Sequence, residues 1–182
     1  MDTKLNKIDV AIRQLDAAIR FFFSKEDPVA IHTLTCAAHK LLSDLTKGSF
    51  LLNGDWMVPE RKSEILKLFK LPQNFFKHAD KDPSATIDFN DEVNQFFIYD
   101  SIRMYTKLKE HWTVECYIFN IWFPLKYSGI VTDPQFKEML LMINSVSSSL
   151  DIDWNNYEHV TTLIQFAKEK FPKGISWTWK GE

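Results

Sequence analysis

Residues 27–48 read DPVAIHTLTCAAHKLLSDLTKG and contain the start, the apolar face and the end of one helix. Asp27 suits the N-cap position, and Pro28 suits the first helical position, where its missing N–H costs nothing. Gly48 stands just beyond the last apolar residue, as is typical of a helix end. The stretch therefore predicts an α-helix that ends at about Thr46. Its predicted core stripe consists of Leu34, Ala38, Leu41 and Leu45.

Helical periodicity continues on both sides of this stretch. Further helices are predicted over about 2–24, 60–82, 90–111, 133–150 and 155–171, with Pro72 kinking the second of these. Residues 113–127 are ambiguous, because their β-branched and aromatic residues favour a strand. Their apolar spacing is nevertheless helical, and Thr113 is a good N-cap, so a buried helix is predicted. Trp177 and Trp179 alternate in the tail, as in an extended segment that lays its rings against the body.

These elements predict an all-α helical bundle of about seven helices in a single domain, residues 1–182. Core helices are expected over 1–112, and additional helices with the tryptophan-containing tail over 113–182. Five glycines in 182 residues argue against an all-β fold.

The composition limits the partners and the compartment. The formal net charge of −2 gives no global attraction to nucleic acid, so no DNA partner is expected. The most apolar window, 117–125, is too short to span a bilayer, so no membrane partner is expected. Two cysteines, Cys36 and Cys116, exclude a disulfide framework and suit a reducing cytosol. The expected protein is soluble and cytoplasmic and has no cofactor.

A semi-polar stripe of His32, Cys36, His39 and Ser43 runs along the 27–48 helix. Three of these four residue types bind zinc, and His78 is the nearest candidate for completing a metal site. The alternative is a helix flank that packs against a neighbouring element. No complete ligand set with a known spacing is present, so no structural metal is expected.

The segment Gln73–Pro83 is the second candidate site. Asn74 and His78 stand four residues apart on one predicted helix face, and Asp80 and Asp82 lie near the helix C-terminus, where the macrodipole disfavours acids. Such a cluster could serve in acid–base chemistry or hold a phosphate, or it could simply cap the helix. Residues 60–81 are basic and residues 82–100 acidic, a division that suits either RNA contact or mutual neutralisation.

The Gln73–Pro83 segment and the stretch Val29–Leu34 resemble a group of bacterial all-helical proteins and, more distantly, the HEPN superfamily of helical bundles. Members of that superfamily usually dimerise. Many are RNases of toxin and defence systems, whereas others bind nucleotides or partner proteins. Their motif is an Arg, often followed by a polar residue, and a His a few residues later. In this chain Gln73 stands at the Arg position, and Asn74 and His78 match the other two positions.

The resemblance implies a HEPN-like binding or regulatory protein with a nucleotide, RNA or protein partner near the Asn74–His78 helix. The alternatives are a metal-independent RNase with catalytic His78 and Asn74, and a purely structural or interaction protein. Without the Arg, RNase activity is expected to be absent or very weak. A homodimer is expected, with the His78 helix at or beside the two-fold axis. The residues assigned to binding are Gln73, Lys77, Asp80, Lys81, Asp82, His32 and His39.

Overall fold

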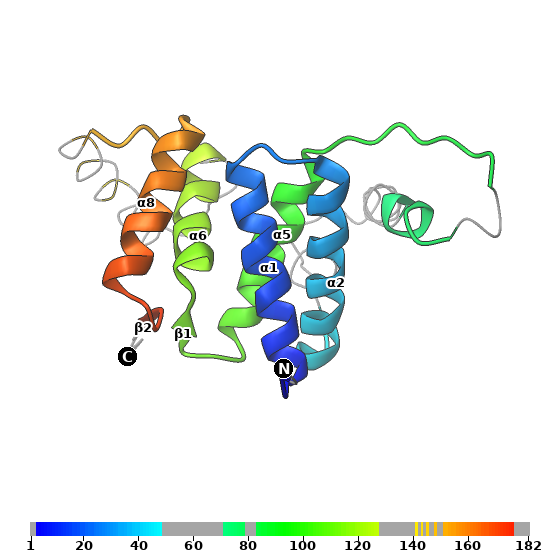
Figure 1. Cartoon of the computed structure of the whole chain (residues 1–182), viewed down its shortest axis with the longest axis horizontal. Helices are drawn as coiled ribbons and strands as arrows, with labels where there is room; N and C mark the ends of the chain where they lie inside the picture. Colours follow the sequence, from blue (N-terminus) through cyan, green and yellow to red (C-terminus); the bar gives the residue numbers. More distant parts are fainter. Residues whose placement is uncertain are drawn as a thin grey trace.

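The computed structural model describes residues 3–48, 71–78, 83–127, 141, 143, 145, 148 and 151–176, and these are mostly helical (Figure 1). The predominantly helical class is therefore confirmed. The described helices are α1 (Lys7–Phe23), α2 (Pro28–Thr46), α5 (Val93–Thr106), α6 (Val114–Lys126) and α8 (Tyr157–Lys170). Most of the predicted helices 60–82 and 133–150, residues 49–59, and the tail residues Trp177 and Trp179 lie outside the described residues.

Local capping sets where the first two helices begin. Asp9 N–H donates to the Asn6 side chain at 2.9 Å, and Asn6 N–H donates back to the Asp9 carboxylate at 3.3 Å. This capping box starts α1 at Lys7 rather than near residue 2. The Asp27 carboxylate accepts from the N–H groups of the next helix's first turn, at 2.8 and 3.0 Å, as the sequence predicted for α2.

The helices α1 and α2 form an antiparallel hairpin, and α5 packs behind both of them (Figure 1). On the opposite side of α1 from α2 lie α6 and α8. One continuous hydrophobic core includes residues from all five described helices. Within it an aromatic cluster joins α1, α6 and α8, with ring centroids 5.1–5.9 Å apart for most pairs. It consists of Phe22, Phe23, Phe119, Trp122 and Tyr157.

The ambiguous stretch 113–127 is helical, as predicted. The Thr113 hydroxyl accepts from the Cys116 N–H at 3.2 Å and caps α6, which is almost wholly buried up to Pro124. Burial on all sides explains why its sequence shows strand-forming residues without a polar face.

A short sheet was not predicted. The expected helix 90–111 ends at Thr106, and His111 and Trp112 form β1 instead (His111–Trp112). This strand pairs antiparallel with β2 (Ile175–Ser176), which follows α8. The pairing brings the C-terminal end of α8 beside the first turn of α6, and a hollow lies at that junction.

Candidate functional site

The polar flank of α2 is buried against α5. His32 is 0% exposed, Cys36 2% and His39 6%, whereas Leu45, which was predicted in the core stripe, is 41% exposed. The buried face of α2 is therefore rotated toward the histidines. It can be buried because α5 supplies polar partners, Asn94 and Asp100, for the two rings.

A chain of hydrogen bonds satisfies the first histidine. His32 Nδ1 lies 2.7 Å from Asn94 Oδ1, and Asn94 Nδ2 donates to the Pro28 carbonyl at 3.0 Å. Because the Asn94 oxygen can only accept, the ring proton belongs on Nδ1, and Nε2 is left to accept from the Cys36 thiol at 3.3 Å. Burial lowers the pKa of His32 despite the Asn94 bond, and burial raises the pKa of Cys36 to about 12. The His32 ring and the Cys36 thiol are therefore neutral at physiological pH.

The second histidine pairs with a buried acid, since His39 Nε2 lies 2.7 Å from Asp100 Oδ2. The stripe is thus a flank packed against a neighbouring helix, which was one of the two predicted interpretations. Among the described residues, no group of three or more His, Cys, Asp or Glu side chains could hold a metal ion. His32 and His39, which were assigned to binding, form hydrogen bonds inside the fold instead of facing solvent.

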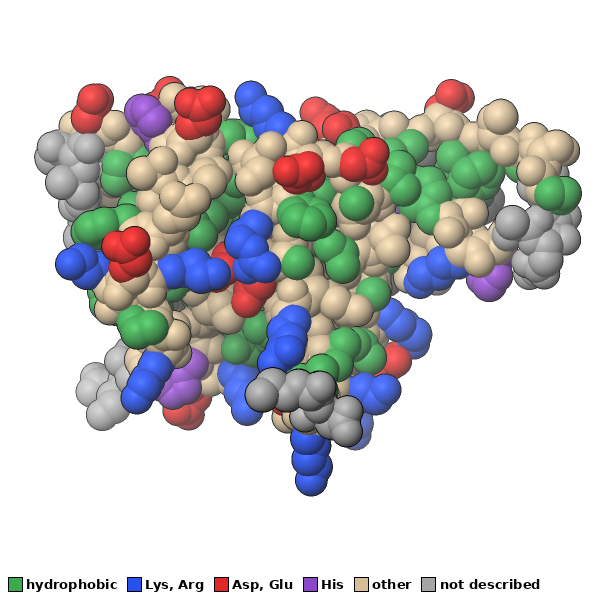
Figure 2. Space-filling view, viewed as in Figure 1, with side chains coloured by type: hydrophobic (Ala, Val, Ile, Leu, Met, Phe, Trp, Pro, Cys, Tyr) green, Lys and Arg blue, Asp and Glu red, His purple; other side chains and the backbone are tan. Residues whose placement is uncertain are grey.

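The segment 71–78 projects from the α2 side of the body (Figure 1). Phe76 anchors it, with ring centroids 5.4 Å from His32 and 5.2 Å from Phe89. Leu71 is 60% exposed and Phe75 is 37% exposed, and Lys77 is exposed as well. Figure 2 shows hydrophobic side chains gathered on this projecting part, with basic and histidine side chains along its edge.

The predicted Asn74–His78 helix face is not formed as expected. The helical turn ends at Phe75, residues 76–77 form a turn, and His78 lies beyond it. Asn74 and His78 are both exposed, and Gln73 is half-buried. Asp80, Lys81 and Asp82 lie outside the described residues, so their assignment to binding remains a prediction.

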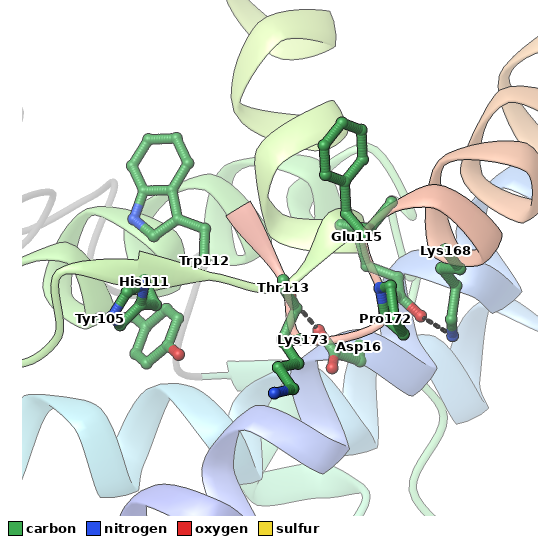
Figure 3. A pocket seen from close by; sticks show the side chains of 12 residues that line it. Asp16, Tyr105, His111, Trp112, Thr113, Glu115, Lys168, Pro172 and Lys173 are labelled. Atoms are coloured by element: carbon green, nitrogen blue, oxygen red, sulfur yellow. Dashed lines mark hydrogen bonds and ion pairs between the residues drawn. The ribbon is translucent and has the colours of Figure 1, made fainter. Parts of the chain in front are cut away.

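A hollow of about 450 Å³ lies where β1, the first turn of α6 and the end of α8 meet (Figure 3). Asp16 of α1 lines it, and the Thr113 hydroxyl donates to Asp16 Oδ1 at 2.6 Å. Burial, followed by repulsion from Glu115, raises the pKa of Asp16 to about 7. At neutral pH this carboxyl is therefore close to half protonated.

Glu115 lines the same hollow but has the opposite surroundings. Its carboxylate accepts from Lys168 Nζ and from Arg20 Nη1, both at 2.6 Å. Burial favours the neutral form, but the bonds from Lys168, from its own backbone N–H and from Arg20 outweigh it and lower the pKa of Glu115. The two neighbouring carboxyls therefore differ, because Glu115 is ionised and Asp16 exchanges a proton near neutrality.

Sequence reasoning missed this site because its residues are far apart along the chain. Asp16 and Thr113 are 97 residues apart, and Lys168 is a further 53 residues from Glu115. The one local signal is Thr113, whose N-cap pattern predicts the start of a helix and says nothing of the hollow. Comparisons with family models, with curated proteins and with solved structures found no match. In the described residues, no helix is both long enough and apolar enough to cross a bilayer.

Proposed function

We propose that this chain is a HEPN-like binding module, that segment 71–78 is its partner-binding element, and that the first partner is a second copy of the chain. The observation that carries the proposal is the exposure of Leu71 and Phe75 on this segment. Large apolar side chains that stand in solvent together on a projecting element are typical of interaction surfaces.

The two apolar side chains are four residues apart on one helical turn and so lie on the same face. Asn74, Lys77 and His78 are also exposed and would form a polar rim around them. An apolar centre with a polar rim is the usual anatomy of a protein interface. Covering the exposed part of each apolar side chain contributes on the order of 1 kcal/mol.

The anchoring of Phe76 supports the same function. Its ring packs edge-on against His32 and Phe89, so the segment is held before any partner arrives. A preorganised element loses less conformational entropy on binding. Lys77 and His78 could also contact RNA phosphates, but Leu71 has no role in such a contact. The exposed apolar pair therefore favours a protein partner over RNA.

Sedimentation equilibrium at micromolar concentration tests the proposal. We expect a mass twice the chain mass of 21.4 kDa for the unaltered protein. Changing Leu71→Asp together with Phe75→Asp should return the mass to that of one chain. Phe166→Asp on α8 is the matched control, because Phe166 is also an exposed apolar side chain, at 57%. That variant should remain dimeric.

A single-chain mass for the unaltered protein would overturn self-association through this segment. A dimer that the double Asp variant leaves intact would overturn the assignment of the interface. Binding of a single-stranded RNA oligonucleotide that is lost on Lys77→Gln would assign the segment to RNA instead.

A further inference from the structure

The hollow beside Asp16 presents hydrogen-bond donors on one side. Figure 3 shows Lys173 extending on the same side of β1 as Asp16, with the Tyr105 hydroxyl turned toward this space. Burial raises the pKa of Tyr105 to about 12, so its hydroxyl keeps its proton at all physiological pH values. An ammonium group and a neutral phenol both donate hydrogen bonds, and this combination suits a ligand that accepts them.

The charges around the hollow favour an anion. Arg20 and Lys168 share the single carboxylate of Glu115, so this trio carries a net positive charge. Lys173 adds another positive charge at the rim, where it is exposed. The first turn of α6 also lines the hollow, and the N-terminus of a helix carries a partial positive charge.

Two described carboxyls line the hollow. Glu115 is paired with Arg20 and Lys168, whereas Asp16 contacts a hydroxyl and a thiol. Its Oδ1 atom accepts from the Thr113 hydroxyl and lies 3.7 Å from the Cys116 thiol. Within the described part of the chain, neither oxygen of Asp16 forms an ion pair. With a proton on Oδ2, Asp16 would become a further donor instead of a repelling charge.

Part of the lining of the hollow is apolar. Phe171 and Pro172 follow α8 directly, and Phe171 is 52% exposed. We propose that the hollow binds a small organic anion, a carboxylate or phosphate group on an apolar body. Lys173, Tyr105 and the protonated Asp16 hold the oxyanion, and the body lies against Phe171 and Pro172.

The proposal predicts tighter binding at lower pH. Asp16 faces Arg20 from its own helix, Glu115 and Cys116 from α6, and Lys168 from α8. Tyr105 from α5, His111 from β1 and Lys173 also line the space around it. With an Asp16 pKa of about 7, the protonated fraction falls about tenfold between pH 6 and pH 8. The dissociation constant of an anion that needs this proton should rise by about the same factor.

Isothermal titration calorimetry with benzoate at pH 6, 7 and 8 tests the inference in a buffer without competing oxyanions. Benzoate should bind, and its dissociation constant should rise up to about tenfold from pH 6 to pH 8. Benzylamine and benzyl alcohol, which have a similar apolar body but are cationic and neutral, should not bind. Inorganic phosphate, which lacks the apolar body, should bind at least about tenfold more weakly than benzoate.

Two variants separate the parts of the site. Asp16→Asn keeps a neutral hydrogen-bonding side chain, so benzoate should still bind but lose most of its pH dependence. Lys173→Gln should weaken binding about tenfold, whereas Lys170→Gln, an exposed cation of α8 outside the hollow, should leave binding unchanged. Circular dichroism checks that each variant is folded.

Several results would overturn the inference. Benzylamine that binds more tightly as the pH rises would mark a cation site at Asp16. Equal effects of Lys173→Gln and Lys170→Gln would show that benzoate binds elsewhere. Unchanged pH dependence in Asp16→Asn would remove Asp16 from the site, and equal affinities for phosphate and benzoate would remove the apolar wall.

Discussion

The buried acids of this protein differ in what surrounds them. Asp100 Oδ2 lies 2.7 Å from His39 Nε2, and the Glu115 carboxylate accepts from two cations, Arg20 and Lys168. Asp16 contacts a hydroxyl and a thiol through Oδ1, and it lines the hollow. Because the folded state disfavours its charge, the folded pKa lies well above the unfolded value of 3.8.

The raised pKa of Asp16 makes the free energy of unfolding depend on pH. Folded protein binds the Asp16 proton more tightly than unfolded protein does, so stability falls as the pH rises from about 4 to about 7. Above that range the penalty is constant. Asp16→Asn removes it, so the variant should exceed the unaltered protein in free energy of unfolding by about 1–3 kcal/mol at pH 8. Near pH 4.5 the gap should be much smaller.

Urea denaturation at pH 4.5, 6 and 8 measures the free energy of unfolding of both proteins. The other titrating groups contribute equally to both, so their effect drops out of the difference. Thr113→Val removes both the hydroxyl donor to Asp16 and the side-chain cap of α6. It should destabilise the protein at every pH, most of all at pH 8, where the carboxylate loses its donor. A variant Asp16→Asn that is less stable at pH 8 would mean that the carboxylate is favourable where it lies.

At the scale of elements, Gly174 allows the chain after α8 to return to β1. Its φ is +85°, a region that other residues rarely adopt, and an added Cβ would lie 2.4 Å from the Trp112 carbonyl oxygen. The residue therefore fixes how closely β2 approaches β1, and with it one wall of the hollow.

We expect Gly174→Ala to lower the free energy of unfolding by about 1–3 kcal/mol, through the clash and the strained φ together. Lys173→Ala, one residue earlier and without a positive φ, is the matched control and should change stability by less than about 0.5 kcal/mol. Thermal unfolding followed by circular dichroism distinguishes them. Equal melting temperatures for the two variants would show that β1–β2 pairing does not depend on this glycine.

Across the whole molecule, the sequence predicted the features that depend on residues close together in the chain, namely where helices begin and how their apolar residues are spaced. The caps Asp27 and Thr113 and the helical spacing located α2 and α6, including the stretch whose composition favoured a strand. The sequence did not predict which face of α2 is buried. His32 is buried and Leu45 is exposed because Asn94 of α5 supplies a hydrogen-bond partner for the His32 ring, and that contact is distant in sequence. The Asp16 hollow was missed for the same reason, since a contact across 97 residues leaves no periodic signal.

The Gln73–His78 segment also differs between the sequence prediction and the fold, and this difference decides whether we expect RNA cleavage. The sequence pattern placed Asn74 and His78 on one helix face, with Gln73 where the HEPN resemblance expects Arg. In the fold the helical turn ends at Phe75, so a shared helix face is not available to the two side chains. Two departures from the motif are therefore present: Gln73 supplies no guanidinium at the Arg position, and the histidine lies beyond the helical turn.

We accordingly expect total RNA to remain intact after prolonged incubation with the purified protein, judged by gel electrophoresis. Loss of one transition-state donor alone costs about 100- to 1,000-fold in rate. Gln73→Arg should also leave RNA intact, because it restores the cation without restoring the helix face. Degradation that His78→Ala abolishes would contradict the prediction and assign catalysis to this segment, whereas degradation that survives His78→Ala would come from a contaminating nuclease. Cleavage gained by Gln73→Arg would show that the missing Arg is the only defect and that His78 is already positioned for the reaction.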